Sequence, residues 1–449
     1  MPGWAQHTIW WHLHPLGFTG AERTALPAHE PPVARLRSLE PWLDHLIDLG
    51  ANGLALGPVF ASETHGYDTV DHLAVDRRLG TDDDLRWLFE ACHARGIRVL
   101  LDGVFNHVGR GFPAFQDVLT HGRTSRYAGW FRLDWHDDRH FDHADFEGHH
   151  HLVALDHGNP EVADHVVAVM DHWLDAGADG WRLDAAYAVP PAFWREVTDR
   201  VRATHPDAWF VGEVIHGPYE PWLTDAGLDA VTQYELWKAM WSAVNDRNLF
   251  ELAWALDRHA ALVQVGTPMT FLGNHDVTRI ATKVADPRHH DHVGVLLLTL
   301  PGVPSIYAGD DHGFTGEKTD TATGDDAVRP AFPADPSQLL PFGWPRFRRT
   351  RELIALRRRH PWLTTATIDV LELSNRQLAY RAHTGDRSLV VLLNLGDEVV
   401  RFDQAADATA ADVRRLAGGA SSDGEPGDPA LLGDDPWELA PHGWAVVAP

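Results

Sequence analysis

Three acidic residues each end a short apolar segment that has the composition of a β-strand. Asp184 ends GWRLD, Glu213 ends WFVGE and Asp276 ends FLGNHD. Two carboxyl groups can cleave an acetal when one attacks the acetal carbon and the other protonates the leaving oxygen. Acids at the carboxyl ends of successive strands of a repeating strand–helix chain meet in one crevice, because a (β/α)8 barrel builds its site from those ends. The spacing therefore predicts a single site with three carboxylates.

Strand and helix signals alternate from residue 7 to about 365, which is typical of parallel β/α architecture. A helix that precedes Gly50 has the glycine in the position of a C-cap. We predict a (β/α)8 TIM barrel made of residues 1–107 and 161–365. Its eight strands are predicted at 7–13, 53–57, 97–102, 179–184, 209–213, 229–232, 269–273 and 303–307.

Two further regions depart from this alternation. Residues 108–160 are rich in Gly, His, Asp and aromatic residues, and they are too long for an ordinary connection, so we predict a short inserted domain over the barrel mouth. Residues 366–449 contain alternating apolar strands joined by turn residues, which predicts a C-terminal antiparallel β-sandwich domain. Within it, the Ala-, Gly- and Asp-rich stretch 405–435 is predicted as an exposed loop.

Composition excludes several classes of partner. The formal net charge of −26, from 38 Lys and Arg against 64 Asp and Glu, repels phosphate backbones and anionic lipids, so neither nucleic acid nor a membrane is expected as a partner. No apolar run of about 18 residues occurs and the first residues lack a secretory leader, so we expect a cytoplasmic protein. Cys92, the single cysteine, falls on a helical apolar stripe and is predicted to be a buried thiol.

The order and wording of five motifs resemble the α-amylase family, glycoside hydrolase family 13, over nearly the whole chain. The motifs are DGVFNH at 102–107, GWRLDAAY at 180–187, VGEV at 211–214, FLGNHD at 271–276 and GVPSIYAGD at 302–310. Within the family the chain looks most like the neopullulanase, cyclomaltodextrinase and maltogenic amylase group. The resemblance implies that Asp184 is the nucleophile, Glu213 the general acid/base and Asp276 the carboxylate that grips sugar hydroxyls in the transition state.

The same resemblance implies further contacts around the cleaved sugar. Arg182 would orient the nucleophile, and we expect its charge to depress the pKa of Asp184. Tyr67 and Asp68, in the loop after the second strand, resemble a family loop whose tyrosine stacks on the sugar ring. The remaining positions implied to bind substrate are Asp102, His107, Asn274 and His275.

Two aromatic residues in the insert allow two interpretations. Trp130 and Phe131, in SRYAGWF, resemble residues that the neopullulanase group contributes to its cleft, and we count them as substrate-binding candidates. The alternative is that both rings pack inside the insert.

The chain departs from the family pattern at two positions. Calcium-binding members carry an aspartate where this chain has Ala154, and a calcium site needs hard oxygen ligands, so the prediction is no cofactor, with calcium as the alternative. Typical α-amylases have a lysine where this chain has Tyr187, so the leaving-group side differs and Tyr187 is counted as a substrate contact. The triple His149–His151 leaves a zinc site as a weaker alternative.

These features predict a retaining hydrolase of short or cyclic α-glucans, with an oligosaccharide as its small-molecule partner. Ala185, directly after the nucleophile, resembles enzymes that cut α-1,4 bonds, while α-1,6 cleavage stays open. An α-glucan transglycosylase would share every catalytic residue. A catalytically silent carbohydrate-binding protein would be expected to have lost some of the acids. The sequence leaves the oligomeric state open, a homodimer included.

Overall fold

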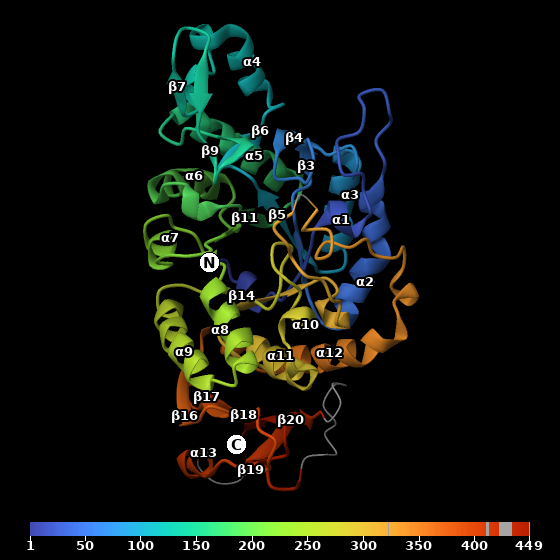
Figure 1. Ribbon diagram of the computed structural model, residues 1–449, viewed down its shortest axis with the longest axis vertical. Coiled ribbons are helices and arrows are strands. Elements are labelled where there is room, and N and C mark those ends of the chain that lie inside the picture. The colour runs from blue at the N-terminus through green and yellow to red at the C-terminus, as the bar shows by residue number, and fades with distance from the viewer. Residues whose placement is uncertain (322, 410–412, 422–432, 449) are drawn as a thin grey trace.

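The computed structural model describes residues 1–321, 323–409, 413–421 and 433–448, and its centre is a parallel barrel (Figure 1). One eight-stranded sheet runs in the order β13-β12-β11-β5-β2-β1-β15-β14. Its two outer strands are joined by a parallel bridge between Thr232 and Met269, and the N–H of Gln233 donates to Met269 O at 2.9 Å. The sheet is therefore closed, and the predicted (β/α)8 barrel is confirmed.

Each barrel strand overlaps its predicted segment. The strands are β1 (Trp10–Leu13), β2 (Gly53–Leu56), β5 (Arg98–Gly103), β11 (Gly180–Leu183), β12 (Trp209–Gly212), β13 (Ala230–Val231), β14 (Met269–Phe271) and β15 (Val303–Tyr307). All of their residues except Arg98 are buried, because helices cover the outer face and side chains fill the interior. Inside the barrel Trp10 and Trp209 stack with ring centroids 5.4 Å apart.

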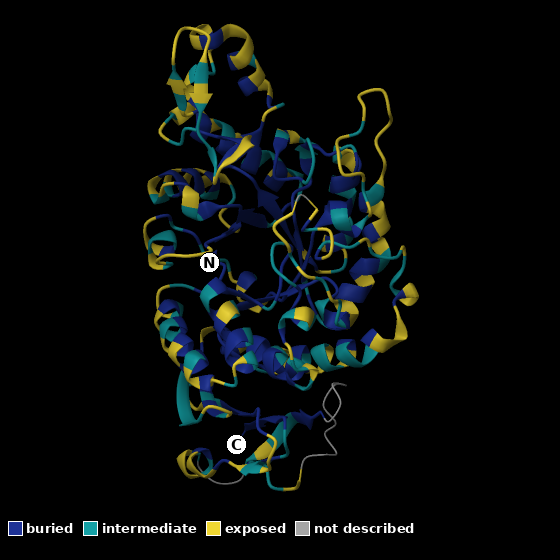
Figure 2. Ribbon diagram, viewed as in Figure 1, coloured by how far each residue is buried: buried dark blue, intermediate teal, exposed yellow. Residues whose placement is uncertain are grey.

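Helices surround the barrel, and the strands at its centre are buried (Figure 2). The longer ones are α2 (Glu40–Leu49), α3 (Asp82–His93), α5 (Pro160–Ala176), α6 (Pro191–Thr204), α8 (Tyr234–Asn245), α9 (Leu249–Val263), α11 (His290–Thr299) and α12 (Trp344–Arg359). Shorter ones are α1 (Pro15–Phe18), α7 (Glu220–Thr224) and α10 (Ile280–Lys283).

Local signals in the sequence account for where individual helices start and stop. Thr81 and Asp84 form a reciprocal capping box at the start of α3. Gly50 ends α2 with a φ of 98°, as the sequence predicts for a C-cap. Cys92 lies buried on α3, which confirms the predicted buried thiol, and burial raises the pKa of this thiol to about 12.

The segment between β5 and α5 forms a compact unit at one end of the barrel (Figure 1). It contains β6 (His107–Gly109), α4 (Pro113–His121), β7 (Leu133–Trp135), β8 (Phe141–His143), β9 (Asp145–Phe146) and β10 (His149–Ala154). Strands β6, β10 and β9 form one antiparallel sheet, and β7 pairs with β8. We call this unit the insert.

The C-terminal region is an antiparallel sheet with the order β16-β17-β18-β22-β20, covered by the short pair β19-β21. These strands are β16 (Thr367–Leu373), β17 (Gln377–Thr384), β18 (Arg387–Asn394), β19 (Val400–Arg401), β20 (Arg414–Ala420), β21 (Glu438–Leu439) and β22 (Gly443–Ala448). The predicted exposed loop at 405–435 is wrong in part, because α13 (Asp403–Ala408) and β20 enter it. Its positions 410–412 and 422–432 lie outside the described residues. No helix in the described ranges is long and apolar enough to cross a membrane.

Candidate active site

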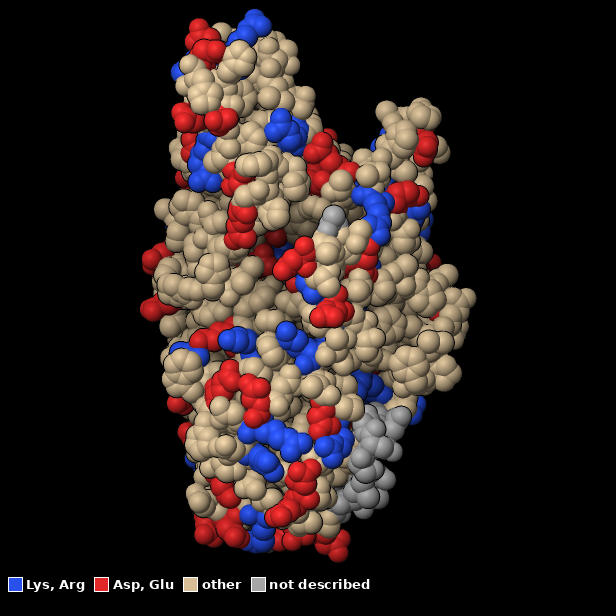
Figure 3. Space-filling view, in the orientation of Figure 1, with Lys and Arg blue, Asp and Glu red and all other residues tan. Residues whose placement is uncertain are grey.

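The carboxyl ends of three neighbouring strands bring the predicted acids together. Asp102 lies in β5, Arg182 in β11, and Asp184 and Glu213 follow directly after β11 and β12. Their exposed fractions lie between 0% and 8%, so all four side chains are withdrawn from bulk water. The molecular surface is hollowed below the insert, with Asp and Glu side chains at the margin of the hollow (Figure 3).

Arg182 is the shared partner of three carboxylates. Its Nη1 lies 2.6 and 2.7 Å from the two oxygens of Asp102 and 3.2 Å from Asp184 Oδ1. Its Nη2 lies 2.7 Å from Glu213 Oε1. One guanidinium therefore faces three acids, and the centre carries more negative than positive charge.

This imbalance overturns the predicted pKa of Asp184. Burial and the neighbouring Glu213 carboxylate raise the pKa of Asp184 well above its usual value, and Arg182 offsets only part of that. Burial likewise raises the pKa of Asp102, although Arg182 opposes it. The prediction of a depressed pKa was wrong because it counted the one cation beside Asp184 and omitted the acids that share it.

Glu213 is held from two sides besides Arg182. Tyr234, the first residue of α8, donates its hydroxyl to Glu213 Oε1 at 3.1 Å, and the N–H of Ala185 donates to Oε2 at 3.1 Å. Ala185 has a φ of 45°. The left-handed region costs a non-glycine residue about 1–2 kcal/mol. The strained backbone immediately after Asp184 thus orients an amide toward the Glu213 carboxylate.

Asp276 has its own cationic partner. Arg329 Nη2 lies 2.8 Å from Asp276 Oδ1, and His275 Nε2 lies 2.8 Å from Oδ2. The side chain of Asn274 accepts the N–H of Asp276 at 2.9 Å. Although burial alone would raise the pKa of Asp276, His275 and Arg329 hold it well below its usual value. Asp276 is therefore ionised near neutral pH.

Tyr67 links these two groups of acids. It lies between β3 (Phe60–Ser62) and β4 (Thr69–Val75), and its ring stacks on His275 with centroids 5.3 Å apart and planes at 9°. Its hydroxyl donates to Asp102 Oδ2 at 3.0 Å and also contacts His275 Nε2. The predicted tyrosine is thus beside the acids, with 9% of its surface exposed.

Asp68 and His107 have protein partners for their polar atoms. Asp68 accepts the N–H and the hydroxyl of Thr64 at 3.0 and 2.6 Å. The ring nitrogens of His107 lie 3.1 Å from Tyr67 O and 3.1 Å from Asn106 Nδ2. Both residues hold the loop that carries Tyr67, and their contacts to sugar stay predictions.

The structure favours the alternative for Trp130 and Phe131, in which both rings pack inside the insert. Trp130 is 9% exposed and Phe131 is 3% exposed. The indole N–H of Trp130 donates to Glu161 Oε2 at 2.8 Å, and Phe131 packs edge-on against Phe115. Both rings are therefore packed within the insert, and their contacts to sugar stay predictions.

Tyr187 and two residues missed in the sequence complete the surroundings of the acids. Tyr187 is half-buried in the 3-10 turn Ala186–Ala188, three residues beyond Asp184. Tyr234 lies two residues beyond a predicted strand, so the rule that strand ends point into the mouth could have found it. Arg329 lies in the long connection after β15, where no strand or helix signal marks it.

The residues around Ala154 do not fit a calcium ion. Ala154 is fully buried in β10 and offers no side-chain oxygen. Asn106 Oδ1 is buried without a hydrogen-bond partner, but His157 Nε2 donates to the neighbouring carbonyl of Phe105 at 2.9 Å. Calcium takes six to eight oxygen ligands, and one amide oxygen is far short of that set. The absence of any cofactor stays a prediction.

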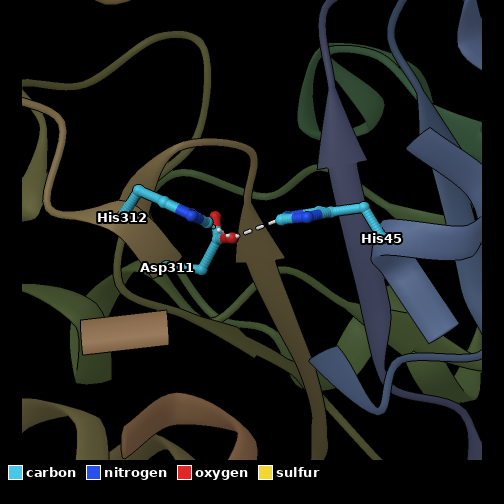
Figure 4. Close-up of side chains that lie close together, drawn as sticks. All are labelled: His45, Asp311 and His312. Carbon is cyan, nitrogen blue, oxygen red and sulfur yellow. Dashed lines mark hydrogen bonds and ion pairs between the residues drawn. The ribbon is translucent and has the colours of Figure 1, made fainter. Parts of the chain in front are cut away.

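Among the described residues, two groups have the spacing to hold a metal ion, and the His149–His151 triple belongs to neither. One is His45, Asp311 and His312 (Figure 4). There Asp311 Oδ2 lies 3.2 Å from His45 Nε2 and 2.9 Å from His312 Nδ1. A single oxygen between two rings is a complete hydrogen-bonded bridge, and it ties α2 to the turn after β15. The other group, Asp286, His289 and His442, has its carboxylate paired with Arg288 at 2.7 Å.

Comparisons with known proteins identify the family of the chain. Residues 35–344, more than half of the chain, match the family model described as the α-amylase catalytic domain. A maltogenic α-amylase from Bacillus acidopullulyticus is 30% identical over 92% of this chain and 74% of its own length. A cyclomaltodextrinase from Geobacillus thermopakistaniensis (strain MAS1) is 31% identical over 91% of this chain and 72% of its own. The structure of cyclic α-maltosyl-(1→6)-maltose hydrolase from Arthrobacter globiformis matches with a TM-score of 0.81 at 28% identity, covering 100% of both chains.

Proposed function

The chain belongs to the α-amylase family of glycoside hydrolases, and from this premise we propose that it hydrolyses α-glucosidic bonds of short or cyclic α-glucans with retention of configuration. The observation that carries the proposal is the bridge from Arg182 to both Asp184 and Glu213. Two acids within the span of one guanidinium are compatible with the separation of about 5–5.5 Å that retaining enzymes use.

In the first step, Asp184 attacks the anomeric carbon while Glu213 gives its proton to the glycosidic oxygen. The bond to the leaving sugar breaks, and a glucosyl ester on Asp184 remains. In the second step, Glu213 takes a proton from water, the water oxygen attacks the same carbon, and the ester bond breaks. Each carboxyl thereby returns to its starting protonation state. Each step inverts the configuration at the anomeric carbon, so the two steps together retain it.

Burial and the neighbouring acids raise the pKa of Asp184, which favours the protonated form of this carboxyl before substrate binds. A bound substrate offers Glu213 an acceptor, the glycosidic oxygen. The proton is then on the acid and the charge is on the nucleophile when the bond breaks.

Asp276 contributes in a different way. Because it is ionised, it can accept hydrogen bonds from sugar hydroxyls, and these strengthen as positive charge develops at the anomeric carbon. Arg329 and His275 fix the direction of its two oxygens. A positioned anion of this kind favours the transition state over the bound substrate.

The names of the similar proteins support small substrates. They describe maltogenic, cyclomaltodextrin-cleaving and cyclic maltosyl-maltose-cleaving enzymes. We therefore assign short and cyclic α-glucans as the substrate class, with α-1,4 bonds first and α-1,6 bonds next. Soluble starch should be a poorer substrate per attackable end.

A product survey tests this proposal. Maltotriose, panose, cyclomaltodextrins and soluble starch would be digested and followed by chromatography, with proton NMR during the first turnovers. We expect the α-anomer to form first. A first-formed β-anomer would overturn the double displacement, and products longer than the substrate at high sugar concentration would indicate transfer to sugar rather than to water.

The roles of the two acids are tested with α-glucosyl fluoride, whose leaving group needs little protonation. Glu213→Gln should still form the glucosyl enzyme from this substrate, because the acid is dispensable there. Asp184→Asn should not form it. Equal residual rates of the two variants on the fluoride would reverse the assignment.

A further inference from the structure

The insert reaches the barrel at a point close to the reacting carboxylates. Tyr187 donates its hydroxyl to Glu147 Oε1 at 2.7 Å, and Glu147 is at the tip of the β9–β10 hairpin. We propose that Glu147, held by Tyr187, recognises the hydroxyls of the departing sugar. This inference rests on the proposed glucosidase function and adds a specificity residue to it.

The position of Tyr187 places the pair on the leaving-group side. Burial raises the pKa of Tyr187, with contributions from Glu147, Glu213 and Asp184, so the hydroxyl stays a donor and lies within the field of both reacting acids. Its ring centroid is 5.1 Å from that of His216, three residues beyond Glu213. Glu213 would protonate the leaving oxygen, so we expect residues beside Glu213, such as His216 and Tyr187, to be near the departing sugar.

The order of the strands supports the same assignment. Tyr187 and His216 follow β11 and β12, whereas Tyr67 follows β2 and His275 follows β14. In a ring of eight strands, β11 and β12 stand opposite β15 and β1. The stack of Tyr67 on His275 and the pair of Tyr187 and Glu147 therefore stand on opposite sides of the barrel mouth.

The backbone conformation of Glu147 is unfavourable for a glutamate, which indicates that the side chain has a role besides forming the turn. Glu147 and Gly148 form the two-residue loop between β9 and β10, with φ of 54° and 85°. Such loops favour Asn-Gly, because both residues need positive φ. A glutamate here costs stability that an asparagine would largely avoid.

The carboxylate of Glu147 also has spare capacity. It is exposed, and among the described residues the hydroxyl of Tyr187 is its hydrogen-bond donor, at Oε1. Oε2 is left to accept from a ligand. An anion anchored through one oxygen presents the other in a fixed direction, which suits a sugar hydroxyl.

Two substitutions test the inference on the whole enzyme. Glu147→Asn suits the turn but is too short to reach Tyr187, so it should leave the melting temperature equal or higher. Its kcat/KM on maltotriose should fall about tenfold, the equivalent of one hydrogen bond to a charged group. On p-nitrophenyl α-glucoside, whose leaving group has no sugar hydroxyl, kcat/KM should not change. Tyr187→Phe keeps the ring and should lie between the parent and Glu147→Asn.

Asp138→Asn is the matched control, because this acid is in the same insert with 95% of its side chain exposed. It should leave both efficiencies unchanged. If Glu147→Asn lowers both substrates equally, or neither, the inference is wrong while the glucosidase stands. A parent enzyme that cleaves neither substrate would overturn the proposed function and this inference with it.

Discussion

The protein buries polar side chains in two places by opposite means. At the catalytic centre, Arg182 faces Asp102, Asp184 and Glu213, and the group is charged. At the contact between the barrel and the C-terminal sheet, three buried imidazoles meet, which we call the histidine junction: His289, His292 and His442. Their pKa values are lowered, chiefly by burial, to about 3 for His289 and about 4 for His292, so the junction is neutral.

The partners of the two clusters differ accordingly. In the junction, His289 Nε2 lies 2.9 Å from His442 Nδ1, and His292 Nε2 lies 3.2 Å from the carbonyls of Asn394 and Gly443. These are uncharged hydrogen bonds that avoid the desolvation of an ion. Three carboxylates share one cation where bonds are to be broken. Neutral imidazoles predominate where the two domains dock, although Asp397 Oδ1 lies 3.0 Å from His442 Nε2 at that contact. The charged cluster should lower the stability of the fold at neutral pH. The neutral histidine junction should lower it only when acid protonates the imidazoles.

Asp184→Asn should give the largest effect. Activity on glucosides should fall at least about 10³-fold, because the nucleophile is lost. The melting temperature at pH 7 should rise. A carboxyl whose pKa is raised by folding costs stability above its unfolded pKa, so removing its charge relieves that cost. Differential scanning calorimetry measures it, and a fall in melting temperature would contradict the comparison.

Arg329→Gln should have the next largest effect. The variant removes the cation beside Asp276, so kcat/KM should fall about 10- to 100-fold. The pKa of Asp276 should rise, and activity should therefore be lost at a higher pH as acid is added. Arg329→Lys keeps the charge and should shift the profile less. If the acidic side of the pH–activity profile is unchanged in Arg329→Gln, Arg329 does not lower the pKa of Asp276.

The histidine junction should respond to acid rather than to loss of activity. A histidine whose pKa is lowered by folding contributes stability that is complete above its unfolded pKa, near 6.5. This stability is lost as pH falls toward about 4 for His292. His292→Gln keeps a donor for Asn394 O but cannot titrate, so its melting temperature should fall less than that of the parent between pH 7 and pH 5. The exposed His29 provides the control, His29→Gln, which should follow the parent.

Chelation should give the smallest effect of all. Because Ala154 supplies no oxygen ligand, prolonged EDTA should change neither the melting temperature nor the activity, since a bound metal would stabilise the folded state through linkage. A loss of many degrees that calcium restores would show that the protein binds calcium and that the prediction from Ala154 is wrong.

The sequence was sufficient to predict the barrel and its three acids, because both follow from local patterns. Buried strands are short apolar runs, and the residue after each run faces the mouth. Asp184 and Glu213 can therefore each be predicted from the single strand that precedes them, and the five family motifs point to the same residues.

Features that depend on several segments at once could not be predicted in this way. The pKa of Asp184 depends on how many acids share Arg182, and that number is set by packing rather than by neighbours in sequence. Arg329 lies in a connection without periodicity. Trp130 is an aromatic residue in a loop, and composition alone does not distinguish a core ring from a sugar platform.

The shared guanidinium also limits how this enzyme can evolve. Because three acids share Arg182, a substitution at any one of them changes the electrostatics of the other two, and such changes are not additive. Paths to new substrates that pass through the centre are therefore strongly epistatic. The hydrogen bond between Tyr187 and Glu147 lies outside this group of charges. If Glu147 contacts the departing sugar as proposed, substitutions in the hairpin of the insert should change substrate preference without altering the partners of Arg182.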